Sequence, residues 1–236
     1  MSVFKKEIMI ESRDVSMSAK LRPSAFLQLF QEIAGDHSTS MGYGYEMTHA
    51  NHVMWIIVKN HVVFHELPAY TDRVVLSTWV TDRRHLLFPR YCRMETPDGR
   101  PLVDAASYYV LVDYYTRQSV FPEQFDIQHS DAPTGNEIAL PGRIRLPEPT
   151  DSVPFTIPYS YIDLNRHMNN VKYVDLAEDV LGLSETGREI KELTIEYVNE
   201  AKLGETLTLS WAKKDDTWYL AGNTDKHIFN LQLRYD

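Results

Sequence analysis

The stretch FLQLFQE at residues 26–32 returns in a diverged form as YVDLAED at residues 173–179. A second pair of matching stretches, VVLS at residues 74–77 and LTLS at residues 207–210, follows in the same order. The first pair has helical apolar spacing and the second is β-rich. The chain therefore predicts an α+β protein with two copies of one unit, each a helix against a curved antiparallel sheet. Two units in one chain cover sheet edges and apolar faces that a lone unit would leave exposed.

The predicted elements follow one order in both halves. In each half an extended segment leads into a helix: residues 4–15 in the first half and residues 155–162 in the second. The helix of the first half starts near Pro23, and the helix of the second half ends at Gly182. Strand-like runs come next, at residues 53–64, 73–81, 86–94 and 102–113, and later at 193–198, 206–212, 218–221 and 228–235. Seven of the 12 prolines lie within residues 121–158, which is typical of a linker. We expect a first unit over residues 1–120, a linker over 121–153 and a second unit over 154–236.

The composition is that of an ordinary globular chain of 236 residues, with 43% hydrophobic and 24% charged residues. It has no apolar run of about 18 residues, and its amino-terminal segment is polar, so neither a membrane span nor a secretory signal is expected. The one cysteine, Cys92, excludes an internal disulfide and suits a reducing cytoplasm. The net charge of −9 argues against nucleic acid as the main ligand.

Three polar residues spaced two apart, Asp163, Asn165 and His167, are the first candidates for chemistry. An extended backbone directs alternate side chains to one side, so we expect the three to share a face. A histidine exchanges protons near neutral pH, and neighbouring Asp and Asn side chains can orient its ring or hold a water molecule. The simpler alternative is a polar turn that caps the following helix, with the histidine filling a gap.

The surrounding residues supply the other groups that acyl chemistry needs. Asn169 and Asn170 can cap a helix that begins near Val171, where backbone N–H groups can hold the oxyanion of an attacked carbonyl. Glu200, at the end of a predicted strand, can activate water or can be an ordinary exposed glutamate. The matching positions of the first half hold Ser16, Ser18, Lys20 and Leu67. We therefore expect one working site in the second half, with the first half as scaffold and ligand wall.

The segment DLNRHMNNVKY at residues 163–173 resembles the D-x-N-x-H-x-N-N-x-x-Y signature of acyl-acyl carrier protein thioesterases. Further matches lie at residues 42–45, 55–58, 78–80, 107–109 and 116–117. The resemblance implies a tandem (double) hotdog fold, in which each antiparallel sheet wraps around one long helix. It also implies hydrolysis of a fatty acyl thioester to free fatty acid and carrier thiol, with no cofactor or metal. The active-site set that it implies is Asp163, Asn165, His167 and Glu200.

Plant members of that family often carry a cysteine directly after the glutamate, where this chain has Ala201. A cysteine nucleophile at this position is excluded, so water must attack. We expect Glu200, helped by Asp163, to activate that water, while Asn165 and His167 position the reactants and His167 passes a proton to the departing sulfur. The spacing leaves open whether Glu200 or His167 acts as the base. The implied partner is an acidic acyl carrier protein that bears a phosphopantetheine-linked acyl chain, and assembly into a homodimer stays open.

Two further sets of residues follow from such a substrate. The acyl chain needs an apolar tunnel, for which we expect Phe26, Leu29, Phe30, Ile33 and Trp55. An ordinary hydrophobic core is the alternative for most of these. An acidic carrier needs a basic docking surface, for which we expect Arg83 and Arg84, beside His85.

Three other functions compete with this one. An acyl-CoA thioesterase of the same fold would share the motifs above. A hotdog hydratase is disfavoured, because its usual signature has proline where this chain has Arg166. A non-catalytic acyl- or lipid-binding module would hold fatty acid without releasing thiol. The pairs His49/His52 and His61/His65 lack an obvious third metal ligand, and Cys92 is expected to pack within a strand.

Overall fold

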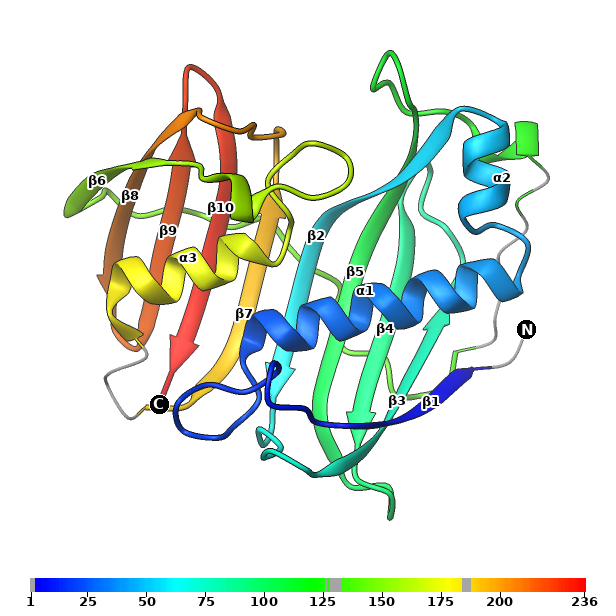
Figure 1. Ribbon diagram of the computed structural model, residues 1–236, viewed down its shortest axis with the longest axis horizontal. Coiled ribbons are helices and arrows are strands. Elements are labelled where there is room, and N and C mark those ends of the chain that lie inside the picture. The colour runs from blue at the N-terminus through cyan, green and yellow to red at the C-terminus, as the bar shows by residue number, and fades with distance from the viewer. Residues whose placement is uncertain (1–2, 126, 128–132, 184–187) are drawn as a thin grey trace. The chain divides into compact units, whose positions relative to one another are not determined.

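The chain folds into two compact units, residues 1–141 and 142–236. The computed structural model describes residues 3–125, 127, 133–183 and 188–236; residues 126 and 128–132 of the expected linker lie outside the described residues. Each unit consists of an antiparallel sheet with a helix across one face (Figure 1), which confirms the predicted α+β class.

The first unit is built on five strands in the part of the chain that the structure describes. They are β1 (Phe4–Met9), β2 (Val53–Phe64), β3 (Arg73–Val80), β4 (Phe88–Glu95) and β5 (Pro101–Asp113). Their order in the sheet is β1-β3-β4-β5-β2, with every neighbouring pair antiparallel. Helix α1 (Pro23–Ser40) crosses this sheet, and α2 (Tyr45–Ala50) and the 3-10 helix η1 (Pro122–Phe125) are short. Pro23 opens α1 as expected, because its fixed φ and missing N–H suit a first helical turn.

The second unit repeats this topology. Its strands are β6 (Asp151–Thr156), β7 (Ile190–Tyr197), β8 (Thr206–Lys214), β9 (Thr217–Asn223) and β10 (His227–Tyr235). The order β6-β8-β9-β10-β7 is that of the first sheet, element for element. Strand β6 begins within the stretch that the sequence assigns to the linker.

Helix α3 (Lys172–Leu181) crosses the second sheet and ends, as predicted, at Gly182, whose φ of 61° is left-handed. The extended segment expected at 155–162 is shorter than predicted. Strand β6 stops at Thr156 and the 3-10 helix η2 (Tyr159–Tyr161) follows Pro158, which has no N–H to continue a strand ladder.

Aromatic side chains fasten each helix to its own sheet. Phe26 of α1 is fully buried, and its ring packs edge-on against Phe64 of β2 with centroids 6.1 Å apart. Tyr173 of α3 packs in the same manner against Phe229 of β10, at 4.8 Å. Burying one such side chain stabilises a fold by about 1.5–3 kcal/mol, so these contacts anchor the helices.

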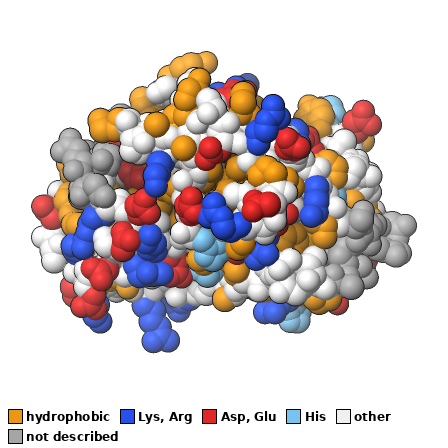
Figure 2. Space-filling model, turned by 90° about the horizontal axis from the view of Figure 1, so that it is seen from below, with side chains coloured by type: hydrophobic (Ala, Val, Ile, Leu, Met, Phe, Trp, Pro, Cys, Tyr) orange, Lys and Arg blue, Asp and Glu red, His pale blue; other side chains and the backbone are white. Residues whose placement is uncertain are grey.

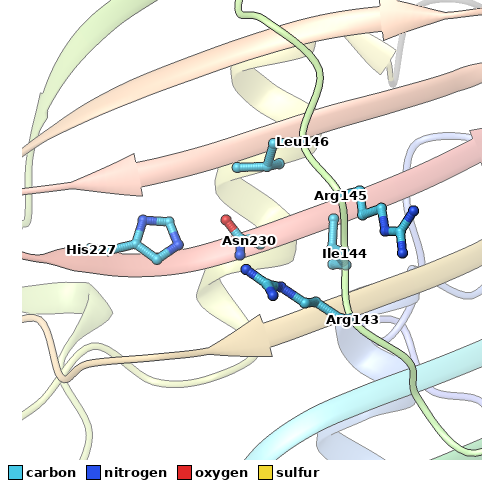
Figure 3. Close-up of a pocket in the computed structure, with 6 residues that line it drawn as sticks. All are labelled: Arg143, Ile144, Arg145, Leu146, His227 and Asn230. Atoms are coloured by element: carbon cyan, nitrogen blue, oxygen red, sulfur yellow. The ribbon is translucent and has the colours of Figure 1, made fainter.

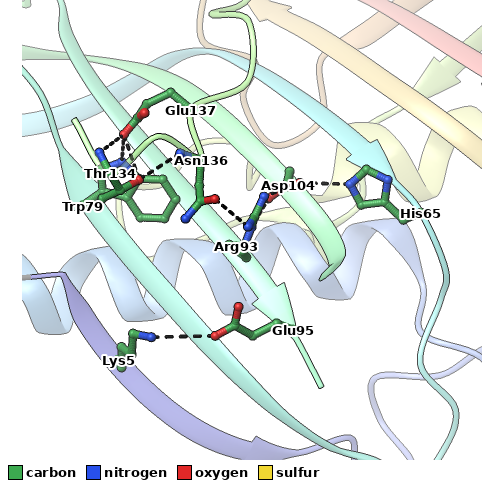
Figure 4. Close-up of polar contacts among 9 residues, drawn as sticks. All are labelled: Lys5, His65, Trp79, Arg93, Glu95, Asp104, Thr134, Asn136 and Glu137. Atoms are coloured by element: carbon green, nitrogen blue, oxygen red, sulfur yellow. Dashed lines mark hydrogen bonds and ion pairs between the residues drawn. The ribbon is translucent and has the colours of Figure 1, made fainter. Parts of the chain in front are cut away.

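Polar contacts attach the segment that follows the first sheet to the face of that sheet opposite α1 (Figure 4). Glu137 accepts a hydrogen bond from Trp79 Nε1 at 2.7 Å, and Asn136 accepts one from Arg93 at 2.9 Å. Arg93 also donates to the buried Asp104 at 2.7 Å, and His65 contacts the other oxygen of Asp104 at 2.9 Å. The buried carboxylate is thus compensated on both oxygens.

The surface of the protein carries charges of both signs. On the face shown in Figure 2, Asp and Glu side chains lie interspersed among Lys and Arg side chains rather than in one acidic patch. Among the residues that the structure describes, no helix is both long enough and apolar enough to cross a membrane.

Candidate active site

The polar segment before α3 is a tight turn. The N–H of Asp163 donates to the carbonyl of His167 at 2.9 Å, and the N–H of Arg166 donates to the carbonyl of Asp163 at 3.0 Å. Arg166 has a φ of 65°, in the left-handed region. The Asp163 carboxylate accepts hydrogen bonds from the N–H groups of Asn165, at 2.8 Å, and His167, at 3.4 Å.

The prediction of an extended backbone over residues 163–167 is therefore wrong. Asp and Asn side chains bond to nearby backbone N–H groups and so compete with extended structure, which turns the chain here. The carboxylate of Asp163 accepts backbone hydrogen bonds within the turn, and the side chain of Asn165 makes no hydrogen bond with any described residue. The two-residue spacing of Asp163, Asn165 and His167 indicated side chains on one face of an extended segment, whereas local hydrogen bonds fold this segment into a turn.

The structure brings His167 and Glu200 together. The N–H of Met168 donates to the carbonyl of Ala201 at 2.8 Å, and a β-bridge joins His167 to Lys202. This pairing places the turn beside the segment that follows β7, and it leaves His167 Nε2 3.0 Å from Glu200 Oε2. The His167 side chain is 14% exposed and that of Glu200 is 36% exposed, so the pair is shielded on one side and open to solvent on the other.

The first unit contains the same turn without the same chemistry. The N–H of Ser16 donates to the carbonyl of Lys20 and that of Ala19 to the carbonyl of Ser16, both at 2.9 Å, and Ala19 has a φ of 58°. The N–H of Leu21 donates to the carbonyl of Pro68 at 2.9 Å, as Met168 does to Ala201. These bonds match those of the second unit at offsets of 147 and 133 residues, which are the offsets between the two pairs of matching stretches in the sequence. The duplication therefore extends to single hydrogen bonds, while the acid and base groups are present in one copy.

The start of α3 narrows the choice of oxyanion donors. Asn169 Oδ1 accepts from the N–H of Val171 at 3.1 Å, which closes a local turn just before the helix. The expected side-chain cap is absent among the described residues, because the N-cap position of α3 is Val171, which has no side-chain capping bond. The N–H of Asn169 donates to the carbonyl of Tyr161 at 2.8 Å, so the N–H groups of Asn169 and Val171 are both already engaged. Among the described residues, the N–H of Asn170 has no acceptor. Of the three expected donors, Asn170 is the one that remains available.

Tyr173 belongs to the signature, but the sequence assigned it no role; its side chain is buried against Tyr197 and Phe229 of the second sheet. Burial, and then the charges of Asp163, Glu205 and Glu200, raise the pKa of Tyr173 well above its usual range. The phenol therefore stays neutral and keeps its proton beside the carboxylates of the site. Its place as the last residue of the signature was the available signal.

The tunnel residues expected from the sequence lie in the first unit. Phe26, Phe30 and Ile33 are almost fully buried between α1 and its sheet, whereas Leu29 is half-buried. Trp55 is half-buried as well, and its Nε1 donates to the carbonyl of Tyr43 at 3.1 Å. The three buried residues belong to the hydrophobic core in this structure.

The residues considered for carrier docking, metal binding and thiol chemistry have ordinary structural contacts. Arg83 forms an ion pair with Glu123, while Arg84 is exposed. His61 donates to the carbonyl of Ala139 at 2.8 Å. Burial raises the pKa of the Cys92 thiol well above its usual value, so the thiolate needed for nucleophilic attack is disfavoured. Among the described residues, no group of three His, Cys, Asp or Glu side chains could hold a metal ion.

Two units of one topology, each an antiparallel sheet against a helix, define a tandem hotdog protein. The sequence profile of the acyl-ACP thioesterase N-terminal domain matches residues 1–128, and that of the C-terminal domain matches residues 146–236. The chain belongs to the acyl-ACP thioesterase family.

Similar proteins include plant enzymes and solved structures. A chloroplastic dodecanoyl-[acyl-carrier-protein] hydrolase of Cinnamomum camphora is 28% identical over 98% of this chain, which spans 64% of that protein. A chloroplastic palmitoyl-acyl carrier protein thioesterase of Arabidopsis thaliana is 26% identical over 84% of the chain, and the match spans 52% of its length. An acyl-ACP thioesterase structure from Bacteroides thetaiotaomicron has a TM-score of 0.85 at 20% identity, with 99% of this chain and 98% of that chain covered. The 12:0-ACP thioesterase structure from Umbellularia californica has a TM-score of 0.79 at 19% identity, with 99% and 97% covered.

Proposed function

We propose that this protein hydrolyses fatty acyl thioesters of acyl carrier protein, releasing free fatty acid and carrier thiol. The observation that carries the proposal is the contact of His167 Nε2 with Glu200 Oε2 at 3.0 Å, in the second-unit copy of the turn, just before α3. A paired imidazole and carboxylate can accept and return a proton near neutral pH. Family membership and the names of the relatives support acyl-ACP as the substrate.

In the proposed reaction, the His167–Glu200 pair takes one proton from a water molecule while the water oxygen bonds to the thioester carbon. The carbonyl oxygen becomes an oxyanion, which accepts a hydrogen bond from the N–H of Asn170. When the carbon–sulfur bond breaks, the pair returns the proton to the sulfur. Asp163 acts as a positioning residue, because its carboxylate holds the turn that carries His167. Asn165 has an uncommitted side chain that can contact the bound thioester.

The substrate side of the proposal keeps the residues expected from the sequence. Of the five residues expected for the acyl chain, the half-buried Leu29 and Trp55 are the ones that it would contact first, because Phe26, Phe30 and Ile33 are packed in the core. An acidic carrier would meet Arg84 more readily than the paired Arg83. The single cysteine favours a reducing compartment such as the cytoplasm. Coenzyme A is the alternative carrier, since the same pair would hydrolyse either thioester.

The test is thiol release from matched acyl-carrier and acyl-CoA substrates of several chain lengths. We expect turnover to favour the carrier-bound series, and His167→Ala to lower kcat/KM by about 10²–10⁴. Lys20→Ala is the matched control, because Lys20 occupies the same turn position in the first unit. Bound fatty acid without thiol release would show a lipid-binding module instead, and a preference for acyl-CoA would replace the carrier as substrate.

A further inference from the structure

The second sheet has two faces with different partners. Tyr173 of α3 packs its ring against Tyr197 of β7 and Phe229 of β10, at 5.6 Å and 4.8 Å. Side chains alternate along a strand, so the neighbouring residues Glu196 and Asn230, which are paired across the two strands, face away from α3. Figure 3 shows the segment 143–146 crossing this second face, with α3 behind the sheet.

A pocket of about 780 Å³ lies between that segment and β10. It is lined by Arg143, Ile144, Arg145, Leu146, His227 and Asn230. This volume falls within the range of about 300–1,000 Å³ that small-molecule sites occupy. The residues of the proposed active site belong to the turn before α3 and the loop after β7, and none of them lines this pocket.

One wall of the pocket is fixed by a buried carboxylate. Glu196 is 7% exposed, and it accepts the N–H of Ile144 at 3.2 Å and Nδ2 of Asn230 at 2.9 Å. The first bond ties the crossing segment to the sheet, and the second joins β7 to β10 within the sheet. They also occupy both carboxylate oxygens, which removes the most basic acceptors from the pocket floor and holds Asn230 in one orientation.

That orientation leaves an acceptor without a donor. Asn230 Oδ1 is buried and has no hydrogen-bond partner among the described residues. Buried polar atoms in native proteins are nearly always satisfied by protein groups or ordered water, so this oxygen can accept a hydrogen bond from water or from a donor on a ligand. A hydroxyl or an N–H group would satisfy it.

The other lining groups indicate an anion. Arg143 extends across the pocket toward Asn230 and His227, while Arg145 points away from them (Figure 3). Neither arginine forms an ion pair with a described residue, and no carboxylate is among the lining side chains. His227 Nδ1 is bonded to Asn223 Oδ1 at 2.7 Å, which fixes the ring. A guanidinium presents a planar pair of donors that matches phosphate or carboxylate oxygens.

We propose that this pocket is a second binding site, for a small anion that carries a hydroxyl or N–H donor next to its phosphate or carboxylate. Arg143 binds the anionic group and Asn230 Oδ1 accepts from the donor. Leu146 and Ile144 provide apolar contact at the wall. Since none of the proposed catalytic residues lines the pocket, it is a site separate from the one that would hold the thioester carbonyl.

The experiment is calorimetric titration of the full chain with glycerol 3-phosphate, glycerate, inorganic phosphate and glycerol. We expect saturable binding of glycerol 3-phosphate or glycerate, whichever anion the site accepts, and weaker binding of phosphate or glycerol alone. Arg143→Gln should weaken binding at least about tenfold, because it removes a charge-assisted hydrogen bond. Arg145→Gln is the matched comparison, since it removes the same charge from the same segment at a pocket rim residue whose guanidinium points away from Asn230 and His227.

The outcomes separate a built site from general charge attraction. Binding that falls in Arg143→Gln and persists in Arg145→Gln supports the proposal. Equal losses in both variants, or no saturable binding of either hydroxylated anion to the wild-type chain, would overturn it. Both arginines are exposed, so folding of the variants is checked by their thermal midpoints, and ligand must raise the wild-type midpoint if it binds the native state.

Discussion

Replacing Asp163 distinguishes a residue that holds the turn from one that takes part in the chemistry through its charge. Its carboxylate accepts a hydrogen bond from the N–H of Asn165 at 2.8 Å and a longer one from that of His167 at 3.4 Å. A hydrogen bond to a charged acceptor contributes about 1.5–3 kcal/mol, and we take about 1.5 kcal/mol because Asp163 is half-buried and the second bond is long. Asp163→Ala should lower the free energy of unfolding by about that amount.

The effect on catalysis should exceed the effect on stability. The turn sets the position of His167, and a displacement of about 1 Å at a catalytic group can lower the rate by about 10². We therefore expect Asp163→Ala to lower kcat/KM by about 10². Asp163→Asn keeps an oxygen at the same position and loses the charge, so it should retain the turn and stay within about tenfold of wild type.

The assay is steady-state thiol release from one acyl-carrier substrate, combined with urea unfolding of each variant. Ser16→Ala is the matched control, because Ser16 Oγ accepts the N–H of Ser18 at 3.3 Å in the first-unit copy of the turn. It should cost about 0.5 kcal/mol and leave kcat/KM unchanged. If Asp163→Asn loses as much activity as Asp163→Ala while its stability is normal, the charge of Asp163 is needed and the positioning argument is refuted.

Three further predictions can be checked with single variants. Glu200→Gln should lower kcat/KM by about 10²–10⁴ with an unchanged circular dichroism spectrum, and a rate near that of wild type would remove Glu200 from the active site. Gly222→Ala should destabilise the chain by about 1–3 kcal/mol in urea unfolding, because its Cβ would lie 2.2 Å from the Phe229 ring; Gly142→Ala, with nothing within 4 Å, should change stability by less than about 0.5 kcal/mol. Burial raises the pKa of Glu137, but hydrogen bonds from Thr134 and Trp79 outweigh the burial, so the pKa is lower than its ordinary value of 4.5. The contact of Glu137 with Trp79 should therefore be present at pH values above 4.5 and should be lost as the pH falls through the lowered pKa. Tryptophan fluorescence should follow that loss in wild type and not in Glu137→Gln, and equal pH responses would contradict the assignment.

The repeat, the helices and most strands could be read from the sequence because their signals are local. Apolar spacing at Phe26 and Phe30, proline before the first helix and Gly182 after the second act within a few residues, and the two halves support each other. The strand at Val53–Phe64 was placed at its observed limits for the same reason. The types of side chain in the site, a histidine and a carboxylate in one copy only, also follow from the amino-acid sequence.

Contacts between segments far apart in the chain required the folded structure. Asp163, Asn165 and His167 share a spacing that fits both an extended strand and a turn, and backbone hydrogen bonds to the Asp163 carboxylate select the turn. Glu200 reaches His167 because Met168 pairs with Ala201, a register that no pattern of residue types specifies. The unpaired oxygen of Asn230 likewise depends on Glu196 of another strand. Residue order decides what each segment can form, whereas the distances between reactive atoms arise when strand pairing brings remote segments together.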